Sequence, residues 1–209
     1  MLLLDAALAV VATAIALWLR PWRAVALTGP PWPWLAAWAL MPLWWGLDRY
    51  AAVPLAQPMS GAALLMLMVG WPLAVLSFWP VMALMVLAGG LDAAEGLHRL
   101  VWLGVAPATL MLGIGGVLRR WLPHHLFIYI LGRGFFGTFV ACALASVGAL
   151  MLRVDLSAAV ASDLLIARVL TAFGEAFLTG MLTAIFVALR PQWLATYADR
   201  LYLPPPPAR

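Results

Sequence analysis

The stretch 164–189 reads LLIARVLTAFGEAFLTGMLTAIFVAL and consists almost entirely of apolar residues. A helix that crosses the hydrocarbon core of a membrane needs about 20 such residues. The stretch ends at Arg190-Pro191, where a charge and a residue that interrupts helices follow each other. It therefore predicts a membrane-spanning helix.

Comparable apolar runs cover about residues 2–19, 33–46, 61–90, 100–118 and 126–152. The run 61–90 is long for one span, and Gly70-Trp71-Pro72 interrupts it where proline breaks a helix. The pattern predicts an all-α integral membrane protein, with seven transmembrane helices if Gly70 to Pro72 is a turn and six otherwise. We expect residues 1–203 to form one transmembrane helical domain and residues 204–209 to be a Pro-rich C-terminal tail.

The composition supports the same fold class. Of the 209 residues, 66% are hydrophobic and 10% are charged, whereas soluble domains average roughly half apolar and a quarter charged residues. The formal charge of +4 comes from arginines that stand singly or in pairs between apolar runs. The lipid bilayer is therefore an expected partner, and nucleic acid is not.

The positions of the charges predict an orientation. Seven helices with the N-terminus outside and the C-terminus in the cytoplasm place Arg20, Arg23, Arg119, Arg120 and Arg190 on the inner side. The outer loops would then hold Arg49, Arg99 and Arg153, beside Asp48, Asp92, Glu95, Asp155 and Asp163, and His98 would be a lone loop histidine. This arrangement agrees with the preference for positive residues on the inner side.

Charges inside apolar runs are candidate functional residues, because each costs about 2.5–3.5 kcal/mol at the centre of a membrane. Asp5, Arg133 and Glu175 are such residues. Asp5 lies in the first turn of its helix, where the helix dipole favours an acid. Glu175 lies about halfway along the last helix and Arg133 about two turns into its own helix, so an internal ion pair between them would explain both.

Small residues predict close helix packing, first at Ala12 and Ala16 and again at Gly113-x-Gly115-Gly116 and Gly132-x-Gly134-x-x-Gly137. No Ser/His/Asp or Gly-x-Ser-x-Gly arrangement is present, and the histidines do not have metal-ligand spacing. We therefore expect no catalytic residues, no enzyme activity and no cofactor.

Four blocks of sequence carry a family resemblance: Gly70-Trp71-Pro72-Leu73-Ala74, Arg120-Trp121-Leu122-Pro123-His124, Glu175-Ala176-Phe177-Leu178-Thr179-Gly180-Met181 and Arg190-Pro191-x-Trp193. With these blocks the chain resembles the CbiM-like permeases of energy-coupling-factor (ECF) ABC transporters for cobalt and nickel, in particular their divergent proteobacterial branch. The likeness is best in the C-terminal two-thirds.

The resemblance implies a substrate-capture subunit that works with a second membrane subunit and cytoplasmic ATPase subunits. In that family the metal site uses the terminal amine, a histidine at position two and a histidine from the loop before the short third helix. This chain keeps Met1 and Asp5 but has Leu2 at the second position, and the later loop contains Gln57 and Met59 without histidine. We expect a substrate region around Met1, Asp5, Gln57 and Met59, with no assigned metal ligand.

The expected function is a permease or capture subunit in the bacterial inner membrane, with several membrane passes. The alternative is an accessory or assembly subunit that keeps the fold and does not transport.

Overall fold

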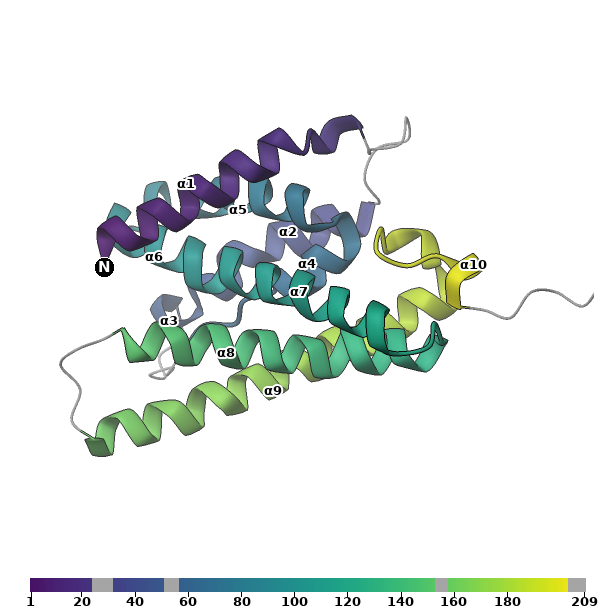
Figure 1. The fold of residues 1–209 in the computed structure, drawn as a ribbon. Helices are drawn as coiled ribbons and strands as arrows, with labels where there is room; N and C mark the ends of the chain where they lie inside the picture. The colour runs from purple at the N-terminus through teal and green to yellow at the C-terminus, as the bar shows by residue number, and fades with distance from the viewer. Residues whose placement is uncertain (24–31, 51–56, 153–157, 203–209) are drawn as a thin grey trace, which may run out of the picture.

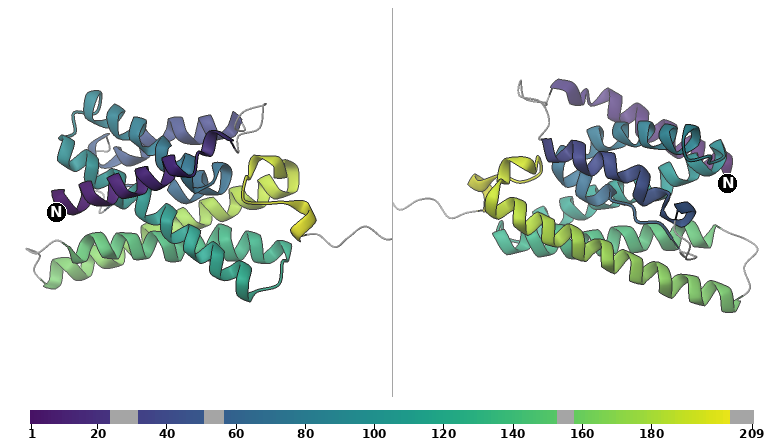
Figure 2. Two further views of the ribbon diagram at one scale, coloured as in Figure 1. Left: turned by 45° about the horizontal axis from the view of Figure 1, so that its top comes forward. Right: turned by 180° about the vertical axis from the view of Figure 1, so that it is seen from behind.

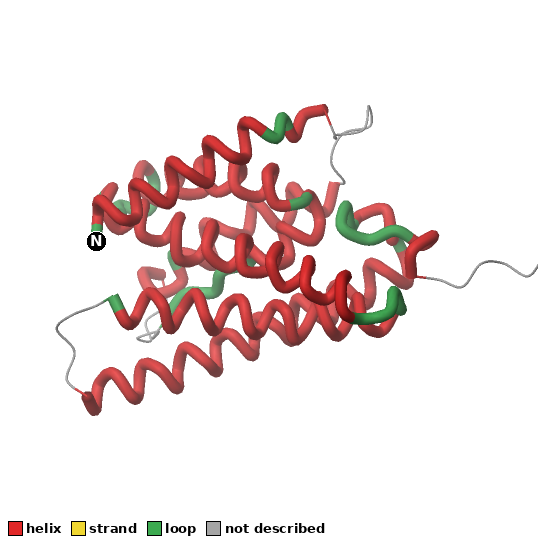
Figure 3. Tube along the Cα trace, in the orientation of Figure 1, coloured by secondary structure: helices red, strands yellow, loops and turns green. Residues whose placement is uncertain are grey.

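The apolar runs form helices. The structure, a computed structural model, describes residues 1–23, 32–50, 57–152 and 158–202 (Figure 1). The described residues are 85% helical, and no strand occurs among them (Figure 3). The all-α prediction is thus confirmed, while the expected tail 204–209 lies outside the described residues.

The amino-terminal half contains α1 (Leu2–Trp18), η1 (Pro21–Arg23), α2 (Trp32–Trp45), α3 (Leu47–Tyr50), α4 (Ala62–Val69), α5 (Trp71–Leu87), α6 (Ala93–Arg99) and η2 (Leu100–Val105). The carboxyl-terminal half contains α7 (Ala106–Trp121), η3 (Ile128–Gly137), α8 (Thr138–Met151), α9 (Ala158–Leu189), η4 (Pro191–Trp193) and α10 (Asp199–Tyr202). η2 and η3 are π-helical stretches within longer helices, a type of distortion that occurs often at functional sites.

Within the described part of the chain, three continuous helices are long and apolar enough to cross a membrane: Ala93–Trp121, Ile128–Met151 and Val160–Leu189. α1 and α5 are shorter apolar helices. Many large apolar side chains lie exposed on the outside of the bundle, such as Leu3, Leu87 and Trp121. In water this surface would be unfavourable, whereas lipid solvates it.

The run 61–90 is divided at Gly70, which is one of the two alternatives that the sequence leaves open. Gly70 has φ 81°, a backbone conformation that glycine adopts without strain, and it separates α4 from α5. α4 lies inside the bundle, and all eight of its residues are buried. The apolar side chains of a helix so enclosed need no polar face.

One boundary differs from the prediction. The helix expected at residues 100–118 begins at Ala93, because the Asp92 side chain caps it by accepting a hydrogen bond from the Ala94 N–H at 3.1 Å. Glu95, His98 and Arg99 are therefore helical residues of α6, and the prediction that they lie in an outer loop is wrong. Arg99 is buried, with 7% of its surface exposed.

The helices run between two ends of the bundle. The N-terminus, α3, α6, the end of α8 and the start of α9 lie at one end, on the left of Figure 1, and α10 lies at the other. We call the first the amino-terminal end. α1 packs against α5 and α6, while α8 and α9 pack together on the opposite side, as the further views show (Figure 2). Ala12 and Ala16 are buried in α1.

Candidate functional site

A cavity of about 190 Å³ lies between α3, α6, η2, α8 and α9. Its polar lining comprises Asp48, Gln57, Glu95, His98, Arg99, Ser146 and Arg168. We call it the polar cavity. Charged groups are expensive inside an apolar bundle and usually mark the path or the site of a solute there.

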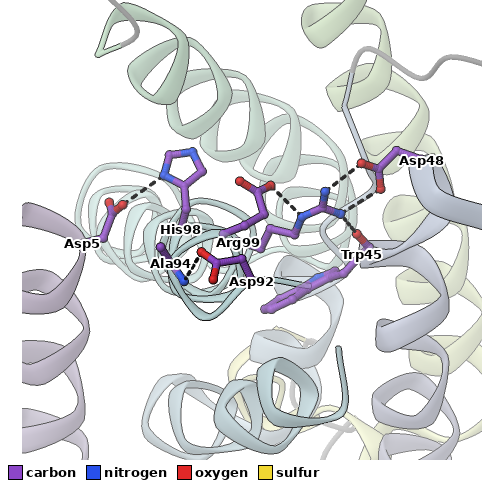
Figure 4. A network of polar contacts seen from close by, with 8 residues as sticks. Asp5, Trp45, Asp48, Asp92, Ala94, His98 and Arg99 are labelled. Carbon is purple, nitrogen blue, oxygen red and sulfur yellow. Dashed lines mark hydrogen bonds and ion pairs between the residues drawn. The ribbon is translucent and has the colours of Figure 1, made fainter. Parts of the chain in front are cut away.

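Arg99 holds one wall of the polar cavity. Its Nη1 and Nη2 donate to the two carboxylate oxygens of Asp48 at 2.8 and 2.7 Å, and its Nε donates to Glu95 at 3.0 Å (Figure 4). Nη1 also donates to the carbonyl oxygen of Trp45, at the end of α2. This two-pronged contact lowers the pKa of Asp48 through hydrogen bonds and charge, against the opposing effect of burial. The network joins α6 to α2 and α3.

Asp5 makes its polar contacts on the other side of α6. Its Oδ2 lies 3.1 Å from Nδ1 of His98, and its Oδ1 accepts a hydrogen bond from the indole N–H of Trp102 at 2.9 Å. Only 2% of the surface of Asp5 is exposed. In Figure 4, His98 points toward Asp5 while the neighbouring Arg99 reaches Asp48. Asp5 therefore ties α1 to α6 and η2.

A second, more open cavity of about 310 Å³ adjoins these residues. It is lined by Met1, Leu2, Asp5, Asp92, Ala94, Glu95 and His98. We call it the acidic cavity, because three of these side chains are carboxylic acids. Glu95 and His98 line both cavities and therefore stand between them.

Gln57 and Arg168 meet at Ser146 on α8. The Gln57 amide Nε2 donates to the Ser146 hydroxyl at 2.7 Å, and Arg168 Nη1 donates to the Ser146 carbonyl oxygen at 2.6 Å. The Gln57 Oε1 atom is buried and has no hydrogen-bond partner among the described residues. A buried acceptor of this kind is normally satisfied, so it indicates a place where a donor can bind.

A buried node of hydrogen bonds lies beside the polar cavity, at the start of α4. Glu175 accepts from the backbone N–H groups of Ser60 and Gly61 at 2.9 and 2.8 Å. The Ser60 hydroxyl donates to the Leu103 carbonyl oxygen at 2.6 Å, and the Ser60 carbonyl oxygen accepts from the Trp45 indole at 2.7 Å. The node therefore fixes the start of α4 against α2, η2 and α9.

The predicted ion pair between Arg133 and Glu175 is wrong. Arg133 donates instead to the carbonyl oxygen of Gly115 at 2.8 Å, and its guanidinium lies 5.9 Å from the centre of the Tyr129 ring. A Cβ atom at Gly115 would lie 2.6 Å from this guanidinium, so the glycine makes room for it. Backbone N–H groups satisfy the carboxylate of Glu175. The prediction looked only for a side chain of opposite charge and therefore overlooked these donors.

The expected substrate residues are divided between the two cavities. Met1 and Asp5 line the acidic cavity, and Gln57 lines the polar cavity. Met59 is half-buried and lines neither of them. The structure thus brings Asp5 and Gln57 to two sides of His98 and does not join all four residues in one site.

Sequence reasoning missed Arg99, Arg168 and Ser146. Arg168 lies within the apolar run 164–189, and 6% of its surface is exposed. A charged residue inside a predicted span is a signal that the sequence alone provides. The Asp92-Ala93-Ala94-Glu95 pattern likewise resembles a helix start and would have placed Arg99 on a helix. Ser146 carries no signal in the sequence, because its role depends on which residues α8 faces.

Among the described residues, no group of three or more His, Cys, Asp and Glu side chains is placed to hold a metal ion. Asp5 and His98 form a close pair without a third such ligand in those ranges. Comparison with protein-family models, curated proteins and solved structures finds no match to the chain.

Proposed function

We propose that the chain is the substrate-capture subunit of an ECF-type transporter in a bacterial inner membrane, and that the polar cavity is its capture site. The observation that carries the proposal is this cavity, which places two arginines and two carboxylates between apolar helices. The bundle surrounds it with helices whose outer surfaces suit lipid. A solute site within such a bundle is typical of transport proteins.

The broken helix next to the cavity supports a transport role. α4 begins inside the bundle, ends at Gly70 and is preceded by the non-helical residues 57–61. Gln57 lines the polar cavity, and Ser60 and Gly61 contact Glu175. Transporters commonly build solute sites from discontinuous helices of this kind, because the exposed backbone groups bind polar ligands.

The distribution of charge supports seven passes, with the amino-terminal end outside. Asp48, Asp92 and Glu95 lie toward the amino-terminal end, whereas Arg119 and Arg120 close α7 at the other end. Positive residues favour the cytoplasmic side. In this arrangement the acidic cavity faces the outside and the C-terminus lies in the cytoplasm.

Affinity purification from the membranes of the native host tests the proposal. The tagged full-length chain should bring down a second membrane subunit together with ATPase subunits, identified by mass spectrometry. A tagged chain that is purified with an unrelated membrane complex, and without an ATPase, overturns the proposal and favours the accessory or assembly subunit. This measurement requires no knowledge of the substrate.

A further inference from the structure

We infer that a shallow pocket at the end of the bundle where α10 lies binds the phosphate group of an anionic phospholipid. The pocket is formed by the end of α7, the residues that follow it, the start of η3 and α10 (Figure 1). We call it the basic pocket. The inference goes beyond the proposed function and does not depend on it. The polar lining of the pocket comprises Arg119, His124, Tyr129, Arg133 and Tyr202.

The basic pocket carries positive charge that no described carboxylate balances. Arg119 and Arg133 supply two guanidinium groups, and no acidic side chain lines the pocket among the described residues. The ion pairs within the described part of the chain include neither of these arginines. The ligand that complements this pocket is therefore an anion.

Arg133 has hydrogen-bond donors left for such a ligand. Its Nη2 donates to the carbonyl oxygen of Gly115 at 2.8 Å, and its buried Nε has no hydrogen-bond partner among the described residues. A guanidinium group has five N–H donors, so this contact uses only one of them. Arginine binds phosphate oxygens with short, charge-assisted hydrogen bonds. The exposed side chains of Arg119 and His124 can add further donors.

The size of the basic pocket excludes a ligand that is enclosed completely. Its volume is about 10 Å³, and a cavity needs about 10–15 Å³ to hold one water molecule. The pocket can therefore admit a single oxygen atom of an anion, while the rest of the ligand lies outside. A small soluble anion would be held by few contacts there, whereas a lipid is already held by the membrane.

The surface around the basic pocket suits the remainder of a lipid molecule. Leu122 lines the pocket and is exposed, and Trp121 and Phe127 are exposed beside it in the sequence. Tryptophan is enriched where the membrane meets water, and exposed apolar side chains at that level contact acyl chains. Basic pockets between membrane helices are sites of this kind for anionic headgroups.

The position of Arg133 along its helix fits the level of the headgroups. It is the sixth residue of η3, and η3 begins the long apolar helix Ile128–Met151. Only about 8 Å along the helix axis therefore separates Arg133 from the first residue. An arginine at this depth can extend its guanidinium group to the membrane surface.

Native mass spectrometry of the purified full-length protein in a non-ionic detergent tests the inference. The probes are phosphatidylglycerol, phosphatidylcholine with the same acyl chains, and inorganic phosphate. We expect the first molecule of phosphatidylglycerol to bind in a saturable manner and more tightly than phosphatidylcholine, because only the anionic lipid brings a net negative charge to the two arginines. An excess of inorganic phosphate should not displace it.

Two adjacent arginines provide a matched pair of variants. Arg119→Gln removes a charge that lines the pocket, so the apparent affinity for phosphatidylglycerol should fall by about fivefold. Arg120→Gln removes the same charge from the next residue, which does not line the pocket, and should keep the affinity of the wild type. Both side chains are exposed, so both variants should fold. Arg133→Gln should also weaken binding; if it does not fold, the comparison of Arg119→Gln with Arg120→Gln decides.

Equal losses of affinity in Arg119→Gln and Arg120→Gln would show a diffuse attraction to the basic surface and would overturn the inference. It is also overturned if phosphatidylcholine binds as tightly as phosphatidylglycerol, or if inorganic phosphate displaces the lipid. None of these results changes which subunits are purified with the chain, so the lipid site and the proposed function are tested separately.

Discussion

The carboxyl group of Glu175 accepts a hydrogen bond from the backbone N–H of Gly61 at 2.8 Å, across 114 positions of the sequence. With its other oxygen it accepts from the N–H of Ser60 at 2.9 Å. These two N–H groups belong to the residues just before α4, and an acid at the start of a helix also complements the helix dipole. One side chain of α9 thus completes the start of α4.

Replacing Glu175 by Ala should destabilise the protein, because two buried N–H groups lose their acceptor. Each buried donor without a partner costs about 1–3 kcal/mol. Glu175→Gln should cost less, since the amide oxygen still accepts one bond. Thermal unfolding in detergent, followed by tryptophan fluorescence, measures both changes. Asp163→Asn is the matched control, because Asp163 is an exposed acid of the same helix. Equal midpoints for Glu175→Gln and Asp163→Asn would contradict the capping role.

The pair of Asp48 and Arg99 should make stability depend on pH. The pKa of Asp48 is lowered below 3.8 in the folded protein by Arg99. The pair therefore stabilises the fold at pH values above 3.8, and this contribution disappears as the pH falls through the lowered pKa. Asp48→Asn should lower the unfolding midpoint at neutral pH, by an amount equivalent to about 1–3 kcal/mol.

The difference between Asp48→Asn and the wild type should shrink as the pH is lowered, since a protonated Asp48 and the amide of the variant are both uncharged. Unfolding midpoints measured in a series of buffers from neutral to acidic pH follow this difference. A difference that stays constant over the whole series would show that charge on Asp48 does not stabilise the fold.

Gly104→Ala should be destabilising because no space exists for a methyl group. A Cβ atom there would lie 2.9 Å from Cδ2 of Phe78 and 3.1 Å from Cη2 of Trp45. Both rings are completely buried, so neither can move away at low cost. Overpacking of this kind costs about 1–3 kcal/mol. At Gly116 nothing lies within 4 Å of the added atom, and Gly116→Ala should be neutral or stabilising by up to about 1 kcal/mol. The two unfolding midpoints decide the prediction, which fails if they are equal.

Asp5 and Trp102 should show an energetic coupling. Asp5→Ala and Trp102→Phe each remove one partner of a 2.9 Å hydrogen bond between α1 and η2. Because the second change removes nothing further from that bond, the double variant should be more stable than the sum of the single effects predicts, by about 0.5–3 kcal/mol. Denaturant or thermal unfolding of the four proteins gives this quantity. Strict additivity would mean that the bond contributes nothing to the packing of α1.

The helices were predictable because hydropathy and helix length follow from local sequence. The break at Gly70 was predictable for the same reason, since glycine and proline two positions apart both disfavour the interior of a helix. The start of α6 was missed because charged residues were interpreted as loop residues. Burial of Arg99 depends on Asp48, which lies 51 positions away.

The candidate site was less predictable than the helices. Asp5 and Glu175 were identified as charges within apolar runs and Gln57 through the family resemblance, but their partners were not. Glu175 binds backbone N–H groups, and every residue except proline has such a group. The sequence therefore does not show which residues contact Glu175. The polar cavity combines α3, α6, α8 and α9, and hydropathy says nothing about which helices are neighbours.

The dependence of α4 on Glu175 has a consequence for biogenesis. α4 has eight residues, so its length is about 12 Å, less than half the thickness of the hydrocarbon core. It is too short to be inserted by the translocon as an independent span. The N–H groups of Ser60 and Gly61, the two residues just before it, obtain their side-chain acceptor from α9, which is synthesised last among the long helices. Ribosomes must therefore complete nearly the whole chain before α4 reaches its final place, and proteins shortened before α9 should be substrates for membrane quality-control proteases.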